Sequence, residues 1–422
     1  MKILVVGGGG REHAVCAALA KSPKVTELFC APGNGGISQI ARCFPDVKAT
    51  DTDSMVSLAR EINAEYVFVA PDDPLALGMV DALEAAGFKA FGPRANAAII
   101  EGSKAFSKAL MKKYNIPTAQ YGEFTDVENA LNYIKAQNTY PTVIKCDGLA
   151  LGKGVIIAEN YEEAKAAAED MLNNQKFGAA GKRIIIEEYL TGAEVTVLAF
   201  TDGKVVVPML SSTDHKRALD GDKGLNTGGM GVIAPSPFYT KAHEQEALER
   251  IIKPTIEAMR SENRPFKGVL YFGLMLTPAG VKVIEYNCRL GDPETQALLP
   301  LLKTDLFEIM TAVIEERLAD ISIEWRDEHA ACVVMASGGY PEAYKTGFEI
   351  SGIDAVADAV VFHAGTKREN KRFLSAGGRV LNVTATGASL DEALAKAYRE
   401  IGKINFEGGF YRKDIGKKVQ KF

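Results

Sequence analysis

The chain reads Val283-Ile-Glu-Tyr-Asn-Cys-Arg-Leu-Gly-Asp-Pro-Glu-Thr295 in the stretch that decides its fold and carries most of its chemistry. Its first residues are typical of a strand. Because side chains alternate faces along a strand, Glu285, Asn287 and Arg289 are expected to project from one side. Carboxylate and amide oxygens suit Mg²⁺, and a guanidinium suits phosphate. With two more carboxylates on the following turn, the stretch predicts metal-assisted phosphoryl chemistry.

The composition bounds what surrounds this stretch. A chain of 422 residues is longer than one hydrophobic core usually serves, so two to four domains are expected. Its 47% hydrophobic and 24% charged residues are ordinary for a globular protein. A net charge of -5 leaves no basic footprint, which argues against nucleic acid as a partner. Phosphate binding would have to be local.

The cysteines and the N-terminus bear on localisation. The six cysteines form no CxxC pair and no zinc-ligand spacing, so buried free thiols in a reducing cytoplasm are expected. The run Met1–Val6 passes directly into glycines and lacks the features of a signal peptide. No apolar run approaches the roughly 20 residues that a membrane span needs. A cytoplasmic protein without a membrane partner is predicted.

Residues 1–101 alternate short apolar runs with helical patterns, which predicts an N-terminal parallel βαβ domain. The expected strands and helices are, in order, Ile3–Val6, Glu27–Cys30, Asp51–Ile62 (helix), Tyr66–Ala70, Leu75–Ala86 (helix) and Ala90–Phe91.

The rest of the chain predicts three α+β units: a core (102–123 and 191–324), a lid (124–190) and a small C-terminal domain (325–422). Ser103-Lys104 is expected to open the first core helix, which must end before Pro117. The lid is expected to have strands Thr142–Cys146, Val155–Ala158 and Arg183–Glu187 and helices Val127–Gln137 and Tyr161–Asn173. In the core we expect a glycine-rich loop at Gly221–Gly231, helices Lys241–Ser261 and Asp305–Arg317, and a hairpin of Val269–Leu276 with Val281–Asn287. The C-terminal domain is expected to have strands Ala331–Ala336, Val360–Phe362 and Arg379–Thr384 and the helix Leu390–Ile401.

Three loops of the N-terminal domain follow predicted strands. Gly7–Gly10 lies between a strand and a helix, where backbone N–H groups can bind phosphate, although Glu12 breaks the dinucleotide G-x-G-x-x-G register. Pro32–Gly36 and Pro71–Leu75 follow the second and third strands. Since carboxyl ends of parallel strands meet at one edge of a sheet, the three loops predict a sugar-phosphate site there. A purely structural tight turn is the alternative for the first loop.

A second glycine-rich segment, Asp147–Gly154, joins two predicted strands and is preceded by Lys145. It fails the P-loop pattern because its glycine spacing is one short, no Ser or Thr follows Lys153, and a strand follows in place of a helix. Two interpretations stay open. The segment is either a hairpin that closes over phosphates or a mobile surface hairpin with solvated lysines.

Other polar segments admit similar pairs of interpretations. The run Ile184–Leu190 could present backbone groups to an adenine edge and a carboxylate to a ribose, or it could simply be a charged strand end. The long loops Asp214–Arg217 and Asn226–Gly231 favour function, because long loops in compact domains are usually functional. His215 has no partner in sequence that would orient it as a general base, so we interpret it as a binding or structural residue.

Several motifs in order closely resemble the glycinamide ribonucleotide synthetase family of the ATP-grasp superfamily. They cover essentially the whole chain: Gly9–Ala14, Glu101–Phe106, Lys145–Gly154, Asp214–Arg217, Asn226–Gly231, Glu285–Glu294, Val361–Thr366 and Arg412–Gly416. Two positions depart from the family pattern, which usually has Asn or Ser where Gly8 stands and Glu where Asp72 stands.

The resemblance implies an ATP-grasp core with a mobile lid and ATP bound between two lobes. It further implies a monomer or weak homodimer that joins glycine to 5-phosphoribosylamine through glycyl phosphate in purine biosynthesis. By resemblance Lys104, Lys145, Lys153, Glu187 and Glu194 bind ATP, and Glu285 and Asn287 hold Mg²⁺ or Mn²⁺. The expected substrate-binding residues are Gly9, Gly10, Arg11, Glu12, Asn34, Gly35, Asp72, Asp214, Asp292 and Glu294. Arg289, Lys153 and Lys216 are the expected catalytic residues.

Three other functions are less well supported. An ATP-grasp carboxylase that uses bicarbonate would share the ATP residues but not Asp214–Arg217 and Gly291–Glu294 in this form. A nucleotide sensor without catalysis would be expected to have lost the metal ligands, which are present here. A nicotinamide dehydrogenase would need the glycine register that the first loop lacks.

Overall fold

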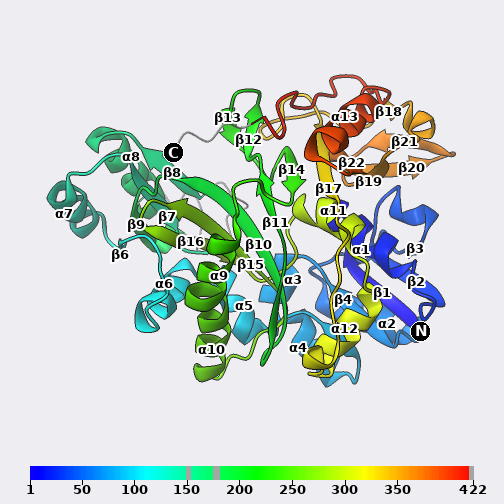
Figure 1. Cartoon of the computed structure of the whole chain (residues 1–422), viewed down its shortest axis with the longest axis horizontal. Helices are drawn as coiled ribbons and strands as arrows, with labels where there is room; N and C mark the ends of the chain where they lie inside the picture. The colour runs from blue at the N-terminus through cyan, green and yellow to red at the C-terminus, as the bar shows by residue number, and fades with distance from the viewer. Residues whose placement is uncertain (149–153, 174–180, 418–422) are drawn as a thin grey trace.

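The computed structural model describes residues 1–148, 154–173 and 181–417 of the chain. A lid sheet lies at one end of the molecule, a large central sheet in the middle, and the N-terminal and C-terminal regions at the other end (Figure 1). Among the described residues no helix is long and apolar enough to cross a membrane.

The N-terminal region forms the predicted parallel sheet, in the strand order β3-β2-β1-β4-β5. The order reverses direction between β1 and β4, and ligands of open parallel sheets bind at such a switch point. The strands are β1 Lys2–Gly7, β2 Glu27–Pro32, β3 Arg42–Cys43, β4 Tyr66–Val69 and β5 Lys89–Phe91, and the helices are α1 Gly10–Leu19, α2 Thr52–Glu61, α3 Asp72–Ala76, α4 Met79–Ala85 and α5 Ala95–Gly102.

The prediction of a single helix over Leu75–Ala86 is wrong. The structure has two helices, α3 and α4, on either side of Gly78, whose φ of 86° lies in the left-handed region. Asp72 begins α3 directly after the loop of β4, one turn earlier than the hydrophobic pattern indicated. Glycine adopts a positive φ without a steric cost, so it ends the first helix and starts the second in a new direction.

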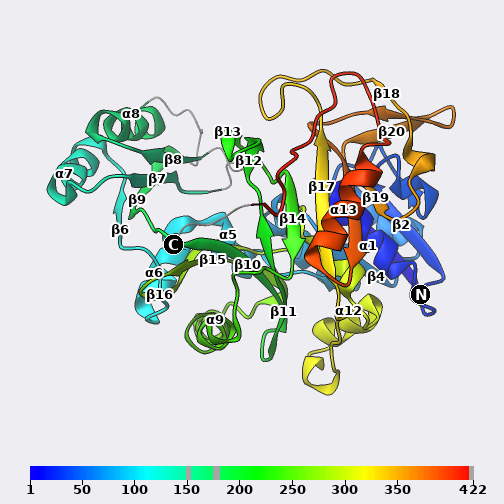
Figure 2. The ribbon, with the colours of Figure 1, turned by 45° about the horizontal axis from the view of Figure 1, so that its top comes forward.

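The lid sheet is antiparallel, in the order β6-β9-β7-β8. Its strands are β6 Tyr121–Phe124, β7 Thr142–Cys146, β8 Val155–Ala158 and β9 Ile184–Glu188, and its helices are α7 Val127–Gln137 and α8 Tyr161–Leu172. The helices and sheet enclose a core of their own, which includes Ile134, Ile144 and Ile186. The lid therefore stands apart from the rest of the molecule in both views (Figures 1 and 2).

The central sheet has eight strands, in the order β16-β15-β10-β11-β14-β17-β22-β19. Their bounds are β10 Ala193–Asp202, β11 Val206–Asp214, β14 Gly231–Ala234, β15 Lys267–Thr277, β16 Gly280–Asn287, β17 His329–Ala336, β19 Val360–His363 and β22 Arg379–Gly387. The pairing of β14 with β17, for example Val232 with Cys332, continues the sheet across the boundary predicted at residue 324. The core and the C-terminal region therefore share one sheet.

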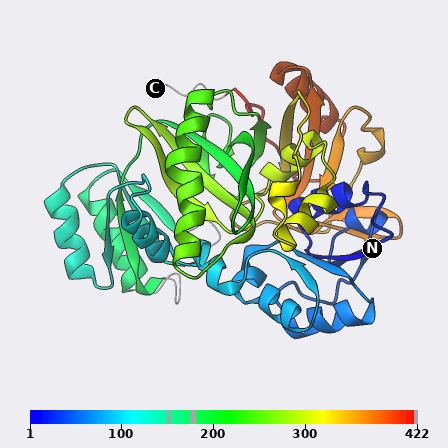
Figure 3. The same ribbon diagram turned by 60° about the horizontal axis from the view of Figure 1, so that its bottom comes forward.

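Helices cover this sheet (Figure 3). The predicted helix Lys241–Ser261 is one continuous helical run in which a π segment, Leu248–Ile252, separates α9 Lys241–Ala247 from α10 Lys253–Ser261. Pro254 follows that segment and has no N–H for the i→i−4 ladder. The other helices of the core and C-terminal region are α6 Lys104–Lys113, α11 Glu294–Leu298, α12 Leu306–Ile314 and α13 Leu390–Ile401, with 3₁₀ turns at Leu299–Leu301, Leu318–Asp320 and Ile353–Ala355. The N-terminal region has one 3₁₀ turn, at Ile37–Gln39.

Some strands were not predicted. The glycine-rich loop Gly221–Gly231 is not wholly a loop, because β13 Lys223–Asn226 pairs with β12 Arg217–Leu219 as a two-stranded hairpin. The C-terminal region also contains a three-stranded sheet of β18 Glu349–Ile350, β20 Thr366–Glu369 and β21 Arg372–Ser375. These strands are two to four residues long and mostly exposed, so they leave little hydrophobic pattern in the sequence.

Candidate active site

The predicted site residues converge where the edge strand β16 lies between the lid and the N-terminal sheet. These residues form two groups. The ATP-side cluster comprises Lys104, Lys108, Lys145 and Glu187. The substrate-side loops are Gly7–Glu12, Pro32–Gly36, Pro71–Leu75 and Gly291–Glu294.

Glu187 is the centre of the ATP-side cluster. It lies on β9, is 4% exposed, and pairs with two lysines. Lys145 Nζ on β7 lies 3.1 Å from its carboxylate, and Lys108 Nζ on α6 lies 3.0 Å from it. Lys145 also donates to the Ile284 carbonyl on β16, at 3.4 Å. The structure thus brings the predicted pair Lys145 and Glu187 together beside the strand that carries the expected metal ligands.

Lys108 was missed by the sequence analysis. Burial lowers the pKa of this lysine to about 8, although Glu187 acts in the opposite direction. Its Nζ also donates to Thr118 Oγ1 at 2.8 Å. A signal was present, because Lys108 lies four residues after Lys104 and side chains at that spacing share a helix face. Only the tertiary contact with Glu187 distinguishes it from a surface lysine.

Lys104 joins the lid to the core. Its Nζ donates to the Gly148 carbonyl at 2.9 Å. Asp147 Oδ1 accepts from Ser103 Oγ and from the Ala105 amide, both at 3.1 Å. These bonds fasten the first residues of the glycine-rich segment to the N-terminus of α6. Lys153 lies outside the described residues, so its predicted role stays a prediction.

Lys216 lies between two predicted ligand residues. Its ammonium donates to Glu194 on β10 and lies 3.7 Å from Glu285 Oε1 on β16. Burial disfavours the charged form, but the Glu194 and Glu285 carboxylates outweigh it and raise the pKa of Lys216 well above its usual value. A fixed positive charge therefore stands at the edge of β16.

Glu285 and Asn287 fit a divalent cation. Both lie on β16, and the Glu285 side chain is 34% exposed, so its oxygens are accessible. Within residues 1–148, 154–173 and 181–417 no group of three His, Cys, Asp or Glu side chains could hold a metal. Two protein oxygens alone suit an ion that keeps its remaining ligands as water and phosphate oxygens, which is how Mg²⁺ is usually bound.

Arg289 links β16, the strand of the expected metal ligands, to the substrate-side loop that carries Asp72. Its Nη2 donates to Asn287 Oδ1 at 3.2 Å and to Glu101 Oε1 at 3.0 Å, and lies 3.6 Å from Asp72 Oδ2. Its buried Nε has no hydrogen-bond partner. Burial opposes ionisation of Asp72, but Arg289 and Arg11 outweigh it and lower the pKa of Asp72. The Nε–H thus stays without a partner on a guanidinium that lies beside three oxygen-bearing side chains.

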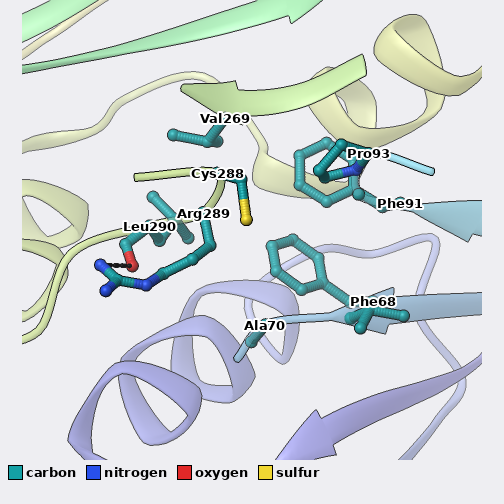
Figure 4. A pocket seen from close by; sticks show the side chains of 10 residues that line it. Phe68, Ala70, Phe91, Pro93, Val269, Cys288, Arg289 and Leu290 are labelled. Atoms are coloured by element: carbon teal, nitrogen blue, oxygen red, sulfur yellow. Dashed lines mark hydrogen bonds between the residues drawn. The ribbon is translucent and has the colours of Figure 1, made fainter. Parts of the chain in front are cut away.

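Glu101 is another residue that the predicted site lacked. Its Oε2 accepts from the Cys288 amide at 2.7 Å, so it orients the turn that carries Arg289. Burial raises the pKa of Glu101 although Arg289 lowers it. Behind this turn the Cys288 thiol projects toward a cavity of about 10 Å³ lined by Phe68 and Phe91 (Figure 4).

The first glycine loop is filled by the side chain of Glu12. Glu12 Oε2 accepts from the Gly9 amide at 2.5 Å, and Oε1 accepts from Arg11 Nε at 2.6 Å. A Cβ on Gly7, whose φ is 121°, would meet the Glu12 side chain at 2.6 Å. The glycine at position 7 is therefore needed to let Glu12 enter the loop. The predicted substrate roles of Gly9, Gly10, Arg11 and Glu12 stay predictions.

Asn34 and Gly35 fasten loops together. Asn34 Nδ2 donates to the carbonyls of Gly8 and His363, at 2.9 and 2.8 Å, and Oδ1 accepts from the amides of Gly36 and Ile37. The Gly35 amide donates to the Thr366 carbonyl at 3.0 Å. The amide of Asn34 and the N–H of Gly35 are thus engaged within the protein, and their substrate contacts stay predicted.

Three predicted acidic residues lie at the junction with the C-terminal region. Arg379 on β22 lies 3.3 Å from Asp292 and donates to the carbonyls of Gly228 and Asp292, at 2.6 and 2.8 Å. Burial, and then the nearby Glu294 carboxylate, raise the pKa of Asp214 well above its usual value. Burial raises the pKa of Glu294 as well. Arg379 was missed because it is remote in sequence from the residues it contacts.

His215 has both ring nitrogens engaged. Nδ1 lies 3.1 Å from the Gly231 carbonyl, and Nε2 accepts from the Gly416 amide at 3.0 Å. The first contact needs a protonated Nδ1 and the second an unprotonated Nε2, so one neutral tautomer satisfies both. This arrangement supports the structural interpretation of His215.

The separate lid, the antiparallel central sheet and the carboxylate and amide at its edge define an ATP-grasp ligase, a class that uses ATP with a divalent metal. Three family profiles together match most of the chain: the phosphoribosylglycinamide synthetase N domain over residues 1–101, the ATP-grasp (A) domain over 102–295, and the C domain over 330–418. The chain belongs to the phosphoribosylglycinamide synthetase family.

Relatives agree with this membership. The phosphoribosylamine-glycine ligase of Clostridium acetobutylicum is 48% identical over 417 residues, covering 99% of this chain and 100% of the relative. That of Caulobacter vibrioides is 49% identical over 420 residues, covering 99% and 98%. The crystal structure of the phosphoribosylamine-glycine ligase of Thermotoga maritima superposes with a TM-score of 0.86 at 31% identity, covering 98% and 100%.

A more distant structure shares only the fold. The biotin carboxylase domain of Hydrogenobacter thermophilus 2-oxoglutarate carboxylase has a TM-score of 0.76 at 17% identity, covering 100% of this chain and 95% of that one. The sequence-based identification of the family and fold is confirmed. The chain is an enzyme, an ATP-dependent ligase.

Proposed function

We propose that the chain joins glycine to 5-phosphoribosylamine with ATP, through glycyl phosphate, to give glycinamide ribonucleotide, ADP and phosphate in de novo purine biosynthesis. The names of the relatives support the substrates. The observation that carries the chemistry is the position of Arg289, next to Asn287 of the metal strand and next to Asp72 of a substrate-side loop.

The reaction has two balanced steps. A glycine carboxylate oxygen forms a bond to the γ-phosphorus, and the bond from that phosphorus to the bridging oxygen breaks, leaving ADP. The neutral amine of phosphoribosylamine then forms the C–N bond, the C–O bond to phosphate breaks, and the nitrogen loses a proton. Phosphorylation is needed because an unactivated carboxylate has a poor leaving group.

The ATP-side cluster supports the first step. In the proposal Lys104, Lys145, Lys153, Glu187 and Glu194 bind the nucleotide, and the lysines offset phosphate charge. Glu285 and Asn287 would hold Mg²⁺, with Mn²⁺ as the alternative, and the bound ion would neutralise charge on the phosphates. Arg289, whose side chain is 18% exposed, would offer its guanidinium to the transferred phosphoryl or acyl-phosphate oxygens, and Lys216 would supply the positive charge nearest Glu285.

The substrate-side loops support the second step. We assign phosphoribosylamine to the edge formed by Gly9, Gly10, Arg11, Glu12, Asn34, Gly35 and Asp72, with Asp214, Asp292 and Glu294 facing it from β11 and the turn after β16. The loops after β1 and β4 flank the switch point of the parallel sheet, which supports this placement.

ADP release tests the proposal. The purified protein is assayed with Mg-ATP, glycine and freshly generated phosphoribosylamine, with each omitted in turn and with Mn²⁺ replacing Mg²⁺ in a parallel series. We expect release to require all three substrates. Release with bicarbonate in place of glycine would overturn the substrate assignment and favour the carboxylase alternative.

We also propose a cytoplasmic location and a monomer or weak homodimer. All six cysteines are free thiols, five of them buried, which suits a reducing compartment. Sedimentation velocity over a range of protein concentrations tests the oligomeric state, and a stable tetramer would contradict it.

A further inference from the structure

The segment Arg412–Gly416 contacts the hairpin that follows Asp214, although some 195 residues separate them in the chain. Figure 2 shows it passing beside β12 and β14. Arg412 is 2% exposed. Its Nη1 donates to the Arg217 carbonyl at 2.9 Å and to Asp222 Oδ1 at 3.0 Å. A buried guanidinium therefore holds both the start and the turn of the hairpin.

Two main-chain amides and one side chain of the same segment add three bonds. The Lys413 amide donates to Asp220 Oδ1 at 2.7 Å, and Asp414 Oδ2 accepts from the Gly221 amide at 2.8 Å. The Gly416 amide donates to His215 Nε2 at 3.0 Å. The contact thus extends from His215, next to the site, to the turn at the far end of the hairpin.

Within residues 1–148, 154–173 and 181–417, the hairpin β12–β13 pairs with no other strand. β12 and β13 form a two-stranded sheet, and such a hairpin is marginally stable in water by itself. Its apolar residues Leu219 and Leu225 are 52% and 51% exposed, so it lacks a core of its own. By contrast, the segment is itself anchored, because the Ile415 amide donates to Tyr398 Oη on α13 at 2.8 Å and Ile415 is fully buried.

Lys216 connects this contact to the site. It precedes β12 directly, and its carbonyl accepts from the Thr227 amide on the returning side of the hairpin, at 2.8 Å. Its ammonium lies between Glu194 and Glu285. An error in the position of the hairpin would therefore move the ammonium relative to the expected metal ligands.

We infer that Arg412 is a positioning residue, and that the segment Arg412–Gly416 acts as a strap that fixes the hairpin so that Lys216 reaches the edge of β16. The inference rests on the proposed function in one respect, since it takes Lys216 as part of the active site. Lys216 pairs with Glu194, which is assigned to the nucleotide, but Lys104, Lys108, Lys145 and Glu187 make none of the strap's hydrogen bonds. Nucleotide binding is therefore expected to change much less than kcat.

The test compares Arg412→Met with Arg412→Lys and with a matched control, Arg372→Met. Arg372 lies on β21 of the same region, and its ion pair with Glu349 is exposed. Three quantities are measured on the full chain: kcat for ADP formation with all substrates, the Kd of ATP, and the rate of tryptic cleavage after Lys223. Asp222→Asn removes one partner of Arg412 and serves if Arg412→Met fails to fold.

We expect Arg412→Met to lower kcat about 100-fold, as misplacement of a catalytic group by about 1 Å does. The Kd of ATP should change less than about 2-fold, and cleavage after Lys223 should become at least ~10-fold faster. The kcat and cleavage rate of Arg412→Lys should lie between those of the wild type and Arg412→Met, because lysine keeps the positive charge but lacks the several N–H donors of the guanidinium. Arg372→Met should match the wild type in all three.

Faster cleavage with an unchanged kcat would reduce the strap to a structural role and overturn the inference, as would equal cleavage rates in Arg412→Met and Arg372→Met. If Arg412→Met does not fold, an Asp222→Asn protein with wild-type kcat and cleavage would do the same. If the wild type releases ADP without glycine, the proposed function fails. The positioning role of the strap is then still tested by the cleavage rates and by whether Arg412→Met loses this glycine-independent ADP release.

Discussion

The ATP-side cluster and the substrate-side loops are built differently. In the cluster, charged side chains pair with one another across separate elements, as Glu187 of the lid does with Lys108 of the core. In the loops, side chains mostly bind backbone groups of other loops, as Asn34 does with Gly8 and His363. In the proposed assignment ATP would share or replace ion pairs, whereas the sugar phosphate would meet loops that are already fixed.

This difference shows what a sequence motif can mean. Lys145, Glu187 and Glu285 present charged groups to the space between two sheets. Asn34 and Gly35 belong to a motif of the same apparent importance, yet their polar groups hold the loop itself. A motif residue can therefore contact a ligand directly, or it can hold the loops that form the site. Only its contacts in the structure distinguish these two roles.

The largest effect is expected from Glu285→Ala, which removes a proposed metal ligand on the ATP side. Loss of outer-shell partners alone typically costs 10–100-fold, so we expect a drop of at least ~100-fold in ADP release. Glu308→Gln, at an exposed ion pair with Lys24, is the control and should stay near wild type. Near-normal turnover of Glu285→Ala would remove Glu285 from the metal site.

Lys108→Met sharpens the comparison because it changes the ATP-side cluster while every residue predicted to bind ATP is kept. Glu187 would keep only Lys145, whose ammonium would then be less available to the nucleotide. We expect the Kd of ATP to rise about 10-fold while the KM of glycine stays constant. Lys112→Met, exposed on the same helix, is the control. Equal Kd values for the two variants would contradict a role for Lys108.

A pH series tests the packing beside the substrate-side loops, where His13 of α1 and His363 of β19 form a buried pair. Burial lowers the pKa of His13 to about 4 and that of His363 to about 3, and His13 Nδ1 accepts the His363 amide at 2.8 Å. Below pH 6.5 the unfolded chain binds protons that the folded chain refuses, so stability is lost as pH falls from 6.5 toward 4. At pH 5 the loss is about 2 kcal/mol for each histidine.

Denaturant unfolding at pH 7 and pH 5 measures this loss. His13→Gln should reduce the difference in unfolding free energy between pH 7 and pH 5. His243→Gln, at the N-terminus of α9, should leave that difference unchanged. An unchanged pH dependence in His13→Gln would show that acid acts elsewhere in the molecule.

The smallest effect on activity is expected from a substitution of Cys288, which lies behind the turn that carries Arg289. Cys288→Ala should enlarge the cavity beside Phe68 and cost about 1 kcal/mol of unfolding free energy, with kcat unchanged. Thermal unfolding together with ADP release measures both. A large fall in kcat would mean that packing behind Arg289, and not only its hydrogen bonds, sets the geometry of the site.

Local signals made much of the fold predictable. The helices Val127–Gln137 and Leu390–Ile401 were predicted to the residue, because Asp126 and Ser389 cap them and their apolar spacing is regular. The break at Gly78 was missed because its effect depends on a left-handed φ. The sheet that joins β14 to β17 was missed because strand pairing across about 100 residues leaves no local trace.

The site divides in the same way. Glu285, Asn287 and Arg289 were found from their spacing on one strand, and the structure brings them together. Lys108, Glu101 and Arg379 were missed because each becomes informative only through a residue far away in sequence: Glu187, Arg289 and Asp292 respectively. Long-range ion pairs of this kind cannot be inferred from composition or periodicity.

The shared central sheet limits how this chain can be divided. Cleaving the gene at codon 324 and expressing the halves separately would leave β14 and β17 as unpaired edges, and both strands are buried along their length. Exposed apolar edges recruit other strands, so each fragment is expected to aggregate by itself. Co-expression should rescue solubility if the two edges find each other, which would make this seam a split-protein reporter site.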